Sequence, residues 1–472
     1  MEYIKFEGIY YAVDLTKKIA TIFRQSSKEV IGDLILPSHV IFNNEEFEVI
    51  EIGELAFYEC EKLQSIILPN TIQKIGEEAF CKCNGLTSIV IPDSVISIAP
   101  FAFSKCKNLV TVSLPQNISI LERGLFKHCS SLIAITIPVG VTKIDDWCFQ
   151  YCKTLATISL PETLLEIGSY AFAECVRLES IVIPNSVKDL CIGAFCRCYL
   201  LKEVNIPLSL TYIGSNTFMD CAIGSITIPN GISSIGSCAF ESCLIESIYI
   251  PHSVRIIGPK AFIANPLNSI ELSEGLEKIG SEAFSGCCFS TMILPDSLQV
   301  LGDKVFADCN QLISITIPEN LNLMGKQCFD HCKNLNSIVW NAIDCHCVWL
   351  EDENDPYSYV YTPFYTIAEQ IKSFIIGKNV KVLPSYMCHR MKNLSAITIP
   401  SSVIEVGEYC FSSCTSLTTI YLLSKTIEFI GTDAFHSLLS LKKVYVDKNC
   451  KSTLLQSGLG ELGDLFIEIC EI

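Results

Sequence analysis

The residues best suited to chemistry are a few neighbouring cysteines and histidines. Cys345-His346-Cys347 could supply metal ligands or a reactive thiolate, and Cys388-His389 could add further ligands after a chain reversal. Zinc sites usually space their ligand pairs as Cys-x-x-Cys, because adjacent side chains point apart, and no such pair occurs in this sequence. We therefore expect no metal and no other cofactor. An enzyme that uses Cys345 and Cys347 is an alternative that thiol labelling of the native protein would test.

Paired carboxylates, which could act in general acid–base catalysis, occur at Glu77-Glu78 and Asp145-Asp146. Both pairs fall at variable positions with nothing nearby that would perturb a pKa, so we interpret them as solvated charges. The sequence lacks the motifs of phosphate-binding loops, dinucleotide folds, zinc proteases and serine hydrolases. It contains no catalytic constellation, and we predict a protein that is not an enzyme.

Most of the chain is an internal repeat of 22 or 23 residues. Twelve uninterrupted units align on the proline that ends each Ile-x-Ile/Leu-Pro stretch, with Ser273 in place of one proline. A phenylalanine follows eleven residues later in all twelve units, and a cysteine follows fourteen residues later in eleven, with Asn265 as the exception. A half unit precedes this array and three degraded units follow it, which gives sixteen coils.

Each unit contains one short alternating run that predicts a β-strand. In Leu86–Ile91, the period of two places Ile89 and Ile91 inward and Ser88 and Val90 outward. Strands related by a constant repeat pair in parallel, so the coils should stack about 4.8 Å apart as a solenoid. We expect turns or helical turns on the return side. Phenylalanines should stack on phenylalanines, and reduced, structural cysteines should form a ladder.

The repeat Leu-x-x-Ile-x-Ile-Pro-x-x-Val-x-x-Ile-Gly-x-x-Ala-Phe-x-x-Cys resembles that of BspA-like leucine-rich repeat proteins over residues 49–446. Residues 1–48 resemble the hairpin-rich N-terminal cap of such proteins, and residues 447–472 resemble their C-terminal cap. The resemblance implies a leucine-rich repeat solenoid with an extended coil at 341–376. It also implies a location at the bacterial cell surface and adhesion to host matrix or other cells.

The composition of this 472-residue chain limits the classes of partner that it is expected to bind. Its net charge of −17 repels phosphate backbones, so we do not expect a nucleic-acid partner. No stretch reaches the roughly 18 apolar residues of a membrane span. The given residues begin without a secretory signal, although a leader removed beforehand would leave the same pattern. A surface or secreted location and a cytoplasmic one therefore both stay open.

The outward strand positions equivalent to Ser88 are serine or threonine in eleven of thirteen coils, which predicts a small, polar strand surface. Departures from this pattern are candidate anchors for a protein or glycan ligand, although drift between coils explains them equally well. One candidate patch combines Glu203, Asn205, Tyr249 and Glu271, and a second combines Tyr421, Lys443 and Tyr445.

The extended coil at 341–376 contains "EDENDPYSYVYTPFY", four acids followed by aromatic residues. These candidate binding residues are Tyr357, Tyr359, Tyr361, Phe364 and Tyr365. Inserted loops on solenoids often carry recognition, but this one could also be a spacer that packs on itself.

Together these features predict a binding module without catalytic activity. We expect it to recognise protein or glycan at a cell surface through the solenoid face and the 341–376 loop. The alternative is an intracellular interaction scaffold, which free thiols and the missing signal would favour. Cell fractionation would separate the two.

Overall fold

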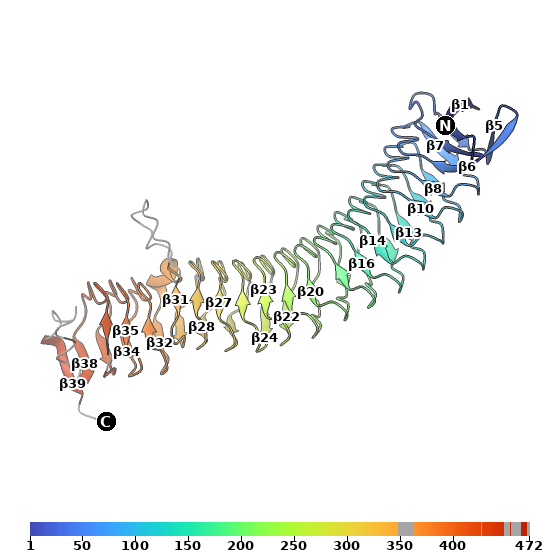
Figure 1. The fold of residues 1–472 in the computed structure, drawn as a ribbon. Coiled ribbons are helices and arrows are strands. Elements are labelled where there is room, and N and C mark those ends of the chain that lie inside the picture. Colours follow the sequence, from blue (N-terminus) through green and yellow to red (C-terminus); the bar gives the residue numbers. More distant parts are fainter. Residues whose placement is uncertain (348–361, 426, 448–453, 455–463, 470–472) are drawn as a thin grey trace. The chain divides into compact units, whose positions relative to one another are not determined.

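The computed structural model describes residues 1–347, 362–425, 427–447, 454 and 464–469, in two compact units, Met1–Gly231 and Ile232–Ile472. In each unit the chain winds into stacked coils (Figure 1). The coils form a parallel β-solenoid of about 17 turns with almost no helix, which confirms the predicted leucine-rich repeat fold.

One set of strands occupies the predicted alternating runs. Neighbouring strands pair in parallel and in register, so that Val112 lies opposite Ile89 and Ile158 opposite Ile135. In the first unit these strands are β4 (Gly32–Ile35), β7 (Leu63–Ile67), β9 (Ser88–Val90), β11 (Thr111–Ser113), β13 (Ala134–Thr136), β15 (Thr157–Ser159), β17 (Ser180–Ile181) and β19 (Glu203–Val204). In the second unit they are β22 (Ser247–Ile250), β24 (Ser269–Leu272), β26 (Thr291–Ile293), β28 (Ser314–Ile317), β30 (Ser337–Trp340), β32 (Ser373–Ile376), β34 (Ala396–Ile399), β36 (Thr419–Leu422), β38 (Lys443–Asp447) and β39 (Phe466–Ile469). We call the outward side of these strands the strand face.

A second set of strands lies on the return side, where turns or helical turns were expected. Apart from β6 each has two residues, such as Lys74–Ile75, which pairs in parallel with Ser97–Ile98. In the first unit they are β6 (Glu45–Ile52), β8 (Lys74–Ile75), β10 (Ser97–Ile98), β12 (Ile120–Leu121), β14 (Lys143–Ile144), β16 (Glu166–Ile167), β18 (Asp189–Leu190) and β20 (Tyr212–Ile213). In the second they are β21 (Ser234–Ile235), β23 (Ile256–Ile257), β25 (Lys278–Ile279), β27 (Val300–Leu301), β29 (Leu323–Met324), β31 (His346–Cys347), β33 (Val382–Leu383), β35 (Glu405–Val406) and β37 (Phe429–Ile430). Two residues are too few to produce an alternating pattern, so these strands could not be predicted from the sequence.

Tight turns follow the return strands, as the residues after β8 illustrate. Ala79 N–H donates to Gly76 O across one turn and Cys83 N–H to Phe80 O across the next. The third residues of these turns, Glu78 and Lys82, have φ of 52° and 63°. A positive φ at this place is the mark of a type II turn, normally occupied by glycine. Backbone bonds to the next coil, such as Lys82 N–H to Ser104 O, hold these left-handed residues in place.

Phenylalanines stack from coil to coil in both units, as predicted. Neighbouring ring centroids lie 5.2–5.8 Å apart in the first unit and 5.2–6.1 Å apart in the second. The first stack comprises Phe57, Phe80, Phe103, Phe126, Phe149, Phe172, Phe195 and Phe218, and the second Phe240, Phe262, Phe284, Phe306, Phe329 and Phe364. These buried rings form the centre of the core.

The cysteine that follows each phenylalanine is a hydrogen-bond donor. Cys106 Sγ lies 3.0 Å from Phe80 O in the preceding coil, and Cys83 Sγ lies 3.1 Å from Phe57 O. Phe80 O also accepts from Cys83 N–H, so this buried carbonyl has two donors. Asn265 takes the cysteine position and donates from Nδ2 to Phe240 O at 2.7 Å. The position therefore selects a buried donor that can reach the previous coil.

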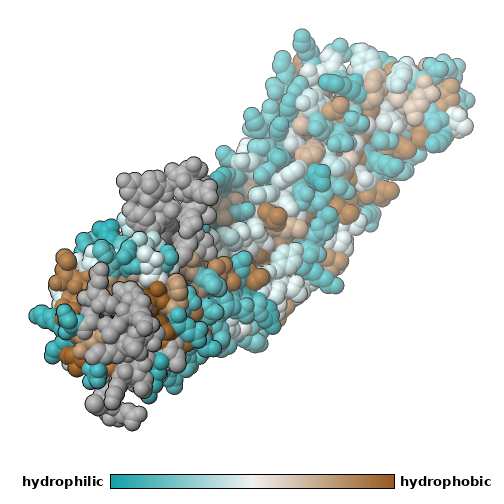
Figure 2. Space-filling model, turned by 60° about the vertical axis from the view of Figure 1, so that its left-hand side comes forward, coloured by the Kyte–Doolittle hydropathy of each residue, from teal (hydrophilic) through white to brown (hydrophobic). Residues whose placement is uncertain are grey.

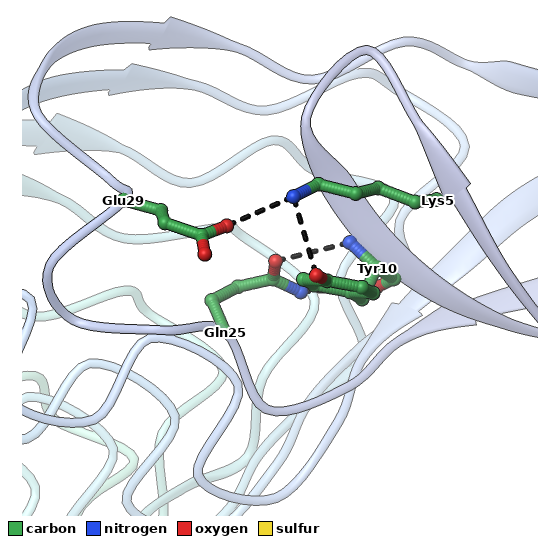
Figure 3. Close-up of polar contacts among 4 residues, drawn as sticks. All are labelled: Lys5, Tyr10, Gln25 and Glu29. Atoms are coloured by element: carbon green, nitrogen blue, oxygen red, sulfur yellow. Dashed lines mark hydrogen bonds and ion pairs between the residues drawn. The ribbon is translucent and has the colours of Figure 1, made fainter.

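Antiparallel strands cover the first coil. β1 (Glu2–Phe6), β2 (Ile9–Asp14) and β3 (Ile19–Ile22) form a meander, and β5 (His39–Phe42) pairs with β6. Gln25 is buried beneath them, where its amide both accepts from Tyr10 N–H and donates to Tyr10 O (Figure 3). The Lys5 ammonium group donates to a carboxylate oxygen of Glu29 and to the hydroxyl of Tyr10 (Figure 3). Gln25 N–H donates to Ala56 O and thereby attaches these strands to the first coil.

Candidate functional site

The strand face has two columns of outward residues, not one. The first is the predicted hydroxyl column, in which Ser88 lies opposite Thr111 and Ser247 opposite Ser269. The second column, two residues further along each strand, is mixed: it holds polar residues such as Ser113, Thr136 and Thr316 in some coils, and in others large apolar side chains that are more than half exposed. They are Ile35, Ile67, Val90 and Val182 in the first unit and Ile293 and Ile375 in the second. One view of the surface shows such exposed apolar residues interspersed among hydrophilic ones (Figure 2).

This partly apolar column was missed by the sequence argument. Val90 was placed outward from the alternation, but the equivalent position was not followed through the other coils. The face is therefore less polar than expected, because β-branched residues that suit a strand also occupy solvent-facing positions.

Tyr421 and Tyr445 form a stacked pair on the strand face of the second unit. They lie opposite each other on β36 and β38, with ring centroids 4.9 Å apart and ring planes 4° apart. Lys443, opposite Thr419, is exposed beside them, and Ile467 lies opposite Tyr445 on β39. The structure thus brings together the second predicted patch and extends it by one apolar residue.

The first predicted patch is divided between the two units. Tyr249 and Glu271 lie opposite each other on β22 and β24 of the second unit, and both are exposed. Ser273 Oγ donates to the Tyr249 hydroxyl at 3.1 Å. Glu203 belongs to the first unit, where it is exposed on β19 opposite Ser180.

Asn205 has a structural role. Its Oδ1 accepts from Ile183 N–H and its Nδ2 donates to Ile183 O, both at 2.8 Å. The side-chain amide replaces the pair of backbone bonds that the end of β19 would otherwise make with the preceding strand. The side chain is also exposed, so a direct contact of Asn205 with a ligand stays a prediction.

Phe364 is a core residue and not an exposed binding residue. It stacks on Phe329 at 5.2 Å and meets the edge of Trp340 at 6.5 Å, with 2% of its surface exposed. Tyr365 is half-buried at the start of the 3-10 helix η2 (Tyr365–Gln370), and its hydroxyl accepts from Arg390. This part of the extended coil therefore packs on its own repeat. Tyr357, Tyr359 and Tyr361 lie outside the described residues.

The Cys345–Cys347 stretch has the properties of packed thiols. Cys345 is buried and Cys347 is half-buried on β31, and His346 between them is exposed. The hydrogen bond to Cys345, followed by burial, holds the pKa of Cys347 well above its ordinary value, so its thiol stays protonated. Among the residues that the structure describes, no group of three His, Cys, Asp or Glu side chains could hold a metal ion.

Stacked parallel coils, most of them with a buried phenylalanine at the same position, define a solenoid repeat protein. The family model described as the BspA type leucine rich repeat region (6 copies) matches residues 39–154, 120–245, 233–344 and 361–456. The chain belongs to this family of BspA-type leucine-rich repeat proteins. Members of the leucine-rich repeat class are typically binding modules without catalytic activity.

Solved structures share this fold. A leucine-rich repeat protein from Bacteroides ovatus is 22% identical, with a TM-score of 0.50 over 99% of this chain and 100% of that chain. A leucine rich cell surface protein from Faecalibacterium prausnitzii is 24% identical, with a TM-score of 0.49 over 80% of this chain and 95% of that chain. A search of curated proteins finds no match. In the described part of the chain, no helix has the length and apolar character needed to cross a bilayer.

Proposed function

We propose that this chain is a recognition module that binds a protein partner on its strand face, with the Tyr421–Tyr445 pair as an anchor. The family and the repeat class support a protein-interaction module. The observation that carries the proposal further is the stacked, solvent-facing tyrosine pair beside Ile467 and Lys443. Tyrosine is enriched among the residues that dominate binding energy, because it offers a large contact area and a hydroxyl at little entropic cost.

The surroundings of the pair favour protein over glycan. Beside the column of small hydroxyls, a second column carries exposed isoleucine, valine or tyrosine in some coils and polar residues in others. Protein partners supply complementary apolar side chains and backbone hydrogen-bond groups for such a surface. A glycan would need more amide and charged groups around the aromatic rings than Thr419, Lys443 and Ile467 provide.

We place this recognition at the cell surface, as adhesion to host protein or to other cells. BspA-type leucine-rich repeat proteins are often found at the cell surface, which supports the proposal. An intracellular scaffold would use the same strand face and differ only in its location. Fractionation of the native cells, with an antibody against the chain, distinguishes the two locations.

The binding proposal is tested with a panel of immobilised extracellular proteins and glycans. We expect the chain to bind at least one protein on the panel and the Tyr421→Ser/Tyr445→Ser variant to bind it about tenfold or more weakly. Tyr212→Ser is the matched control, because Tyr212 and Tyr421 are both 40% exposed and Tyr212 lies on β20, away from the strand face. Binding only to glycans, or equal loss in the control, would contradict the proposal.

A further inference from the structure

Four lysines cluster around one histidine on the turns of the first unit. Lys105 and Lys107 come from one coil, Lys127 from the next, and Lys153 from the coil after that. Lys105 N–H donates to Lys127 O and Lys107 O accepts from Ser131 N–H, which places these turns beside the turn of His128, and all four lysines contribute to lowering the pKa of His128. We call Lys105, Lys107, Lys127 and Lys153 the lysine cluster. It stands out in a chain that carries 51 acidic and only 34 basic residues.

The cluster has no carboxylate partner of its own. Within the residues that the structure describes, none of its four lysines forms an ion pair. The acids at the same turn position in flanking coils are already paired, Glu59 with Lys82 at 2.5 Å and Glu174 with Arg197 at 3.3 Å. Burial and then the neighbouring lysines, Lys127 first, lower the pKa of His128.

The repeated backbone aligns these side chains. Lys105, His128 and Tyr151 occupy the same left-handed turn position, with φ of 62°, 62° and 63°. Bonds from Lys105 N–H to Lys127 O and from His128 N–H to Gln150 O hold successive turns in register. As a result the His128 and Tyr151 rings stack 4.4 Å apart and 5° from parallel. The charges of the cluster therefore follow the stacking direction of the coils, which are about 4.8 Å apart.

Trp147 lies at one side of the lysine cluster and contacts two cationic side chains. Lys127 Nζ lies 4.8 Å and the Arg123 guanidinium 5.7 Å from its ring. Arg123 is also 3.8 Å from Asp146. The cations thus cover the indole face, and His128 and Tyr151 cover each other, which leaves little aromatic surface for a sugar ring to stack on.

We propose that the lysine cluster binds a sulfated polysaccharide, as a second recognition surface independent of the strand face. Its groups are compact lysine point charges, which bind tetrahedral anions such as sulfate esters through charge alone, without the planar fork by which arginine matches carboxylate and phosphate. The only arginine here, Arg123, is engaged with Trp147 and Asp146. A linear chain with regularly spaced sulfates matches charges presented by successive coils. At physiological salt the repulsion from distant acids is screened beyond about 8 Å, so the local cluster governs contact.

The test measures binding of the full chain to heparin, to desulfated heparin and to polyglutamate at several salt concentrations. We expect heparin to bind most tightly, with an affinity that falls steeply as salt rises. Lys105→Gln/Lys127→Gln/Lys153→Gln should weaken heparin binding about tenfold or more. The control Lys278→Gln/Lys333→Gln/Lys378→Gln, at three scattered exposed lysines, should change it less than about twofold.

Three results would overturn the proposal: absence of heparin binding at low salt, equal binding of polyglutamate or desulfated heparin, and equal loss in the control variant. Thermal unfolding of each variant shows whether it is folded. Because Lys127 contacts Trp147, Lys105→Gln/Lys107→Gln provides a second variant at two exposed positions. It should also weaken heparin binding, and unchanged binding in this folded variant would contradict the assignment.

Discussion

At the scale of single residues, Asn265 explains what the repeated cysteine contributes. A thiol and an amide have little in common except a donor that reaches a carbonyl, and both donate to the phenylalanine carbonyl of the preceding coil. The sequence predicted that these cysteines stack as small apolar residues. It could not show the hydrogen bond, because a sulfur donor has no signature in a hydropathy pattern.

We expect Asn265→Ala to destabilise the chain by about 2–3 kcal/mol, because it removes a buried donor and leaves a cavity. Asn265→Cys should cost less than Asn265→Ala, because the thiol restores the donor to Phe240 O but does not replace the Oδ1 that accepts from Ile245 N–H. Urea unfolding followed by circular dichroism measures both variants. Equal losses would show that the donor is unimportant at this position.

Buried thiols should also make the chain sensitive to alkali. Burial raises the pKa of Cys60 to about 11 and that of Cys287 to about 12, from an ordinary 9.0. The folded state therefore holds these protons more tightly than the unfolded state. Their stabilising contribution is complete below pH 9 and is lost as pH rises through 11 and 12.

The urea midpoint should accordingly stay constant between about pH 6 and 7 and fall progressively above about pH 8, where the unfolded thiols begin to lose their protons. Native thiolate absorbance, recorded over the same range, provides the control. If these thiols titrated near pH 9 in the folded protein, they would not be buried as described.

At the scale of elements, the left-handed turns have an unfavourable backbone conformation but align their N–H groups with carbonyls of the next coil. Ser242 has φ of 53° and is exposed, and its N–H donates to Ile263 O in the next coil. A non-glycine residue in this region costs about 1 kcal/mol, which the bonds between coils offset. The strain is acceptable because the neighbouring coils hold the backbone in this conformation.

Ser242→Gly should therefore raise the thermal unfolding midpoint, by an amount equivalent to as much as about 1 kcal/mol. Ser247→Gly, on the exposed side of β22, is the matched control and should lower it, since glycine weakens a strand. Calorimetry measures the thermal unfolding midpoint of both variants. A lower midpoint for Ser242→Gly would mean that the turn does not carry the proposed strain.

The same scale shows where prediction from sequence succeeded and failed. The strands at the alternating runs follow from their period of two, and the phenylalanine stacks follow from a constant spacing. Phe364 was misassigned because the extended coil separates it from its strand by more residues than the repeat allows. Asn205 is exposed, as its outward position by alternation predicts, but the sequence pattern could not show that its amide also turns back to bond Ile183.

At the scale of the whole molecule, recognition surfaces arise as columns, one residue from each coil. The strand face combines a hydroxyl column with a partly apolar one, and the turns of the first unit carry the lysine cluster. Such columns can be predicted from a sequence only when every position of the repeat is compared through all coils. This is why the Tyr421 and Tyr445 patch was found in advance and the partly apolar column and the lysine cluster were not.

The most direct test of strand-face recognition is site-specific photocrosslinking of the protein partner found on the panel. A benzophenone amino acid replaces Tyr421 in one variant and Tyr212, which is equally exposed, in another. We predict that the partner is captured efficiently from position 421 and not from position 212. Capture from position 212 alone, while the position 421 variant still binds the partner, would contradict recognition by the strand face.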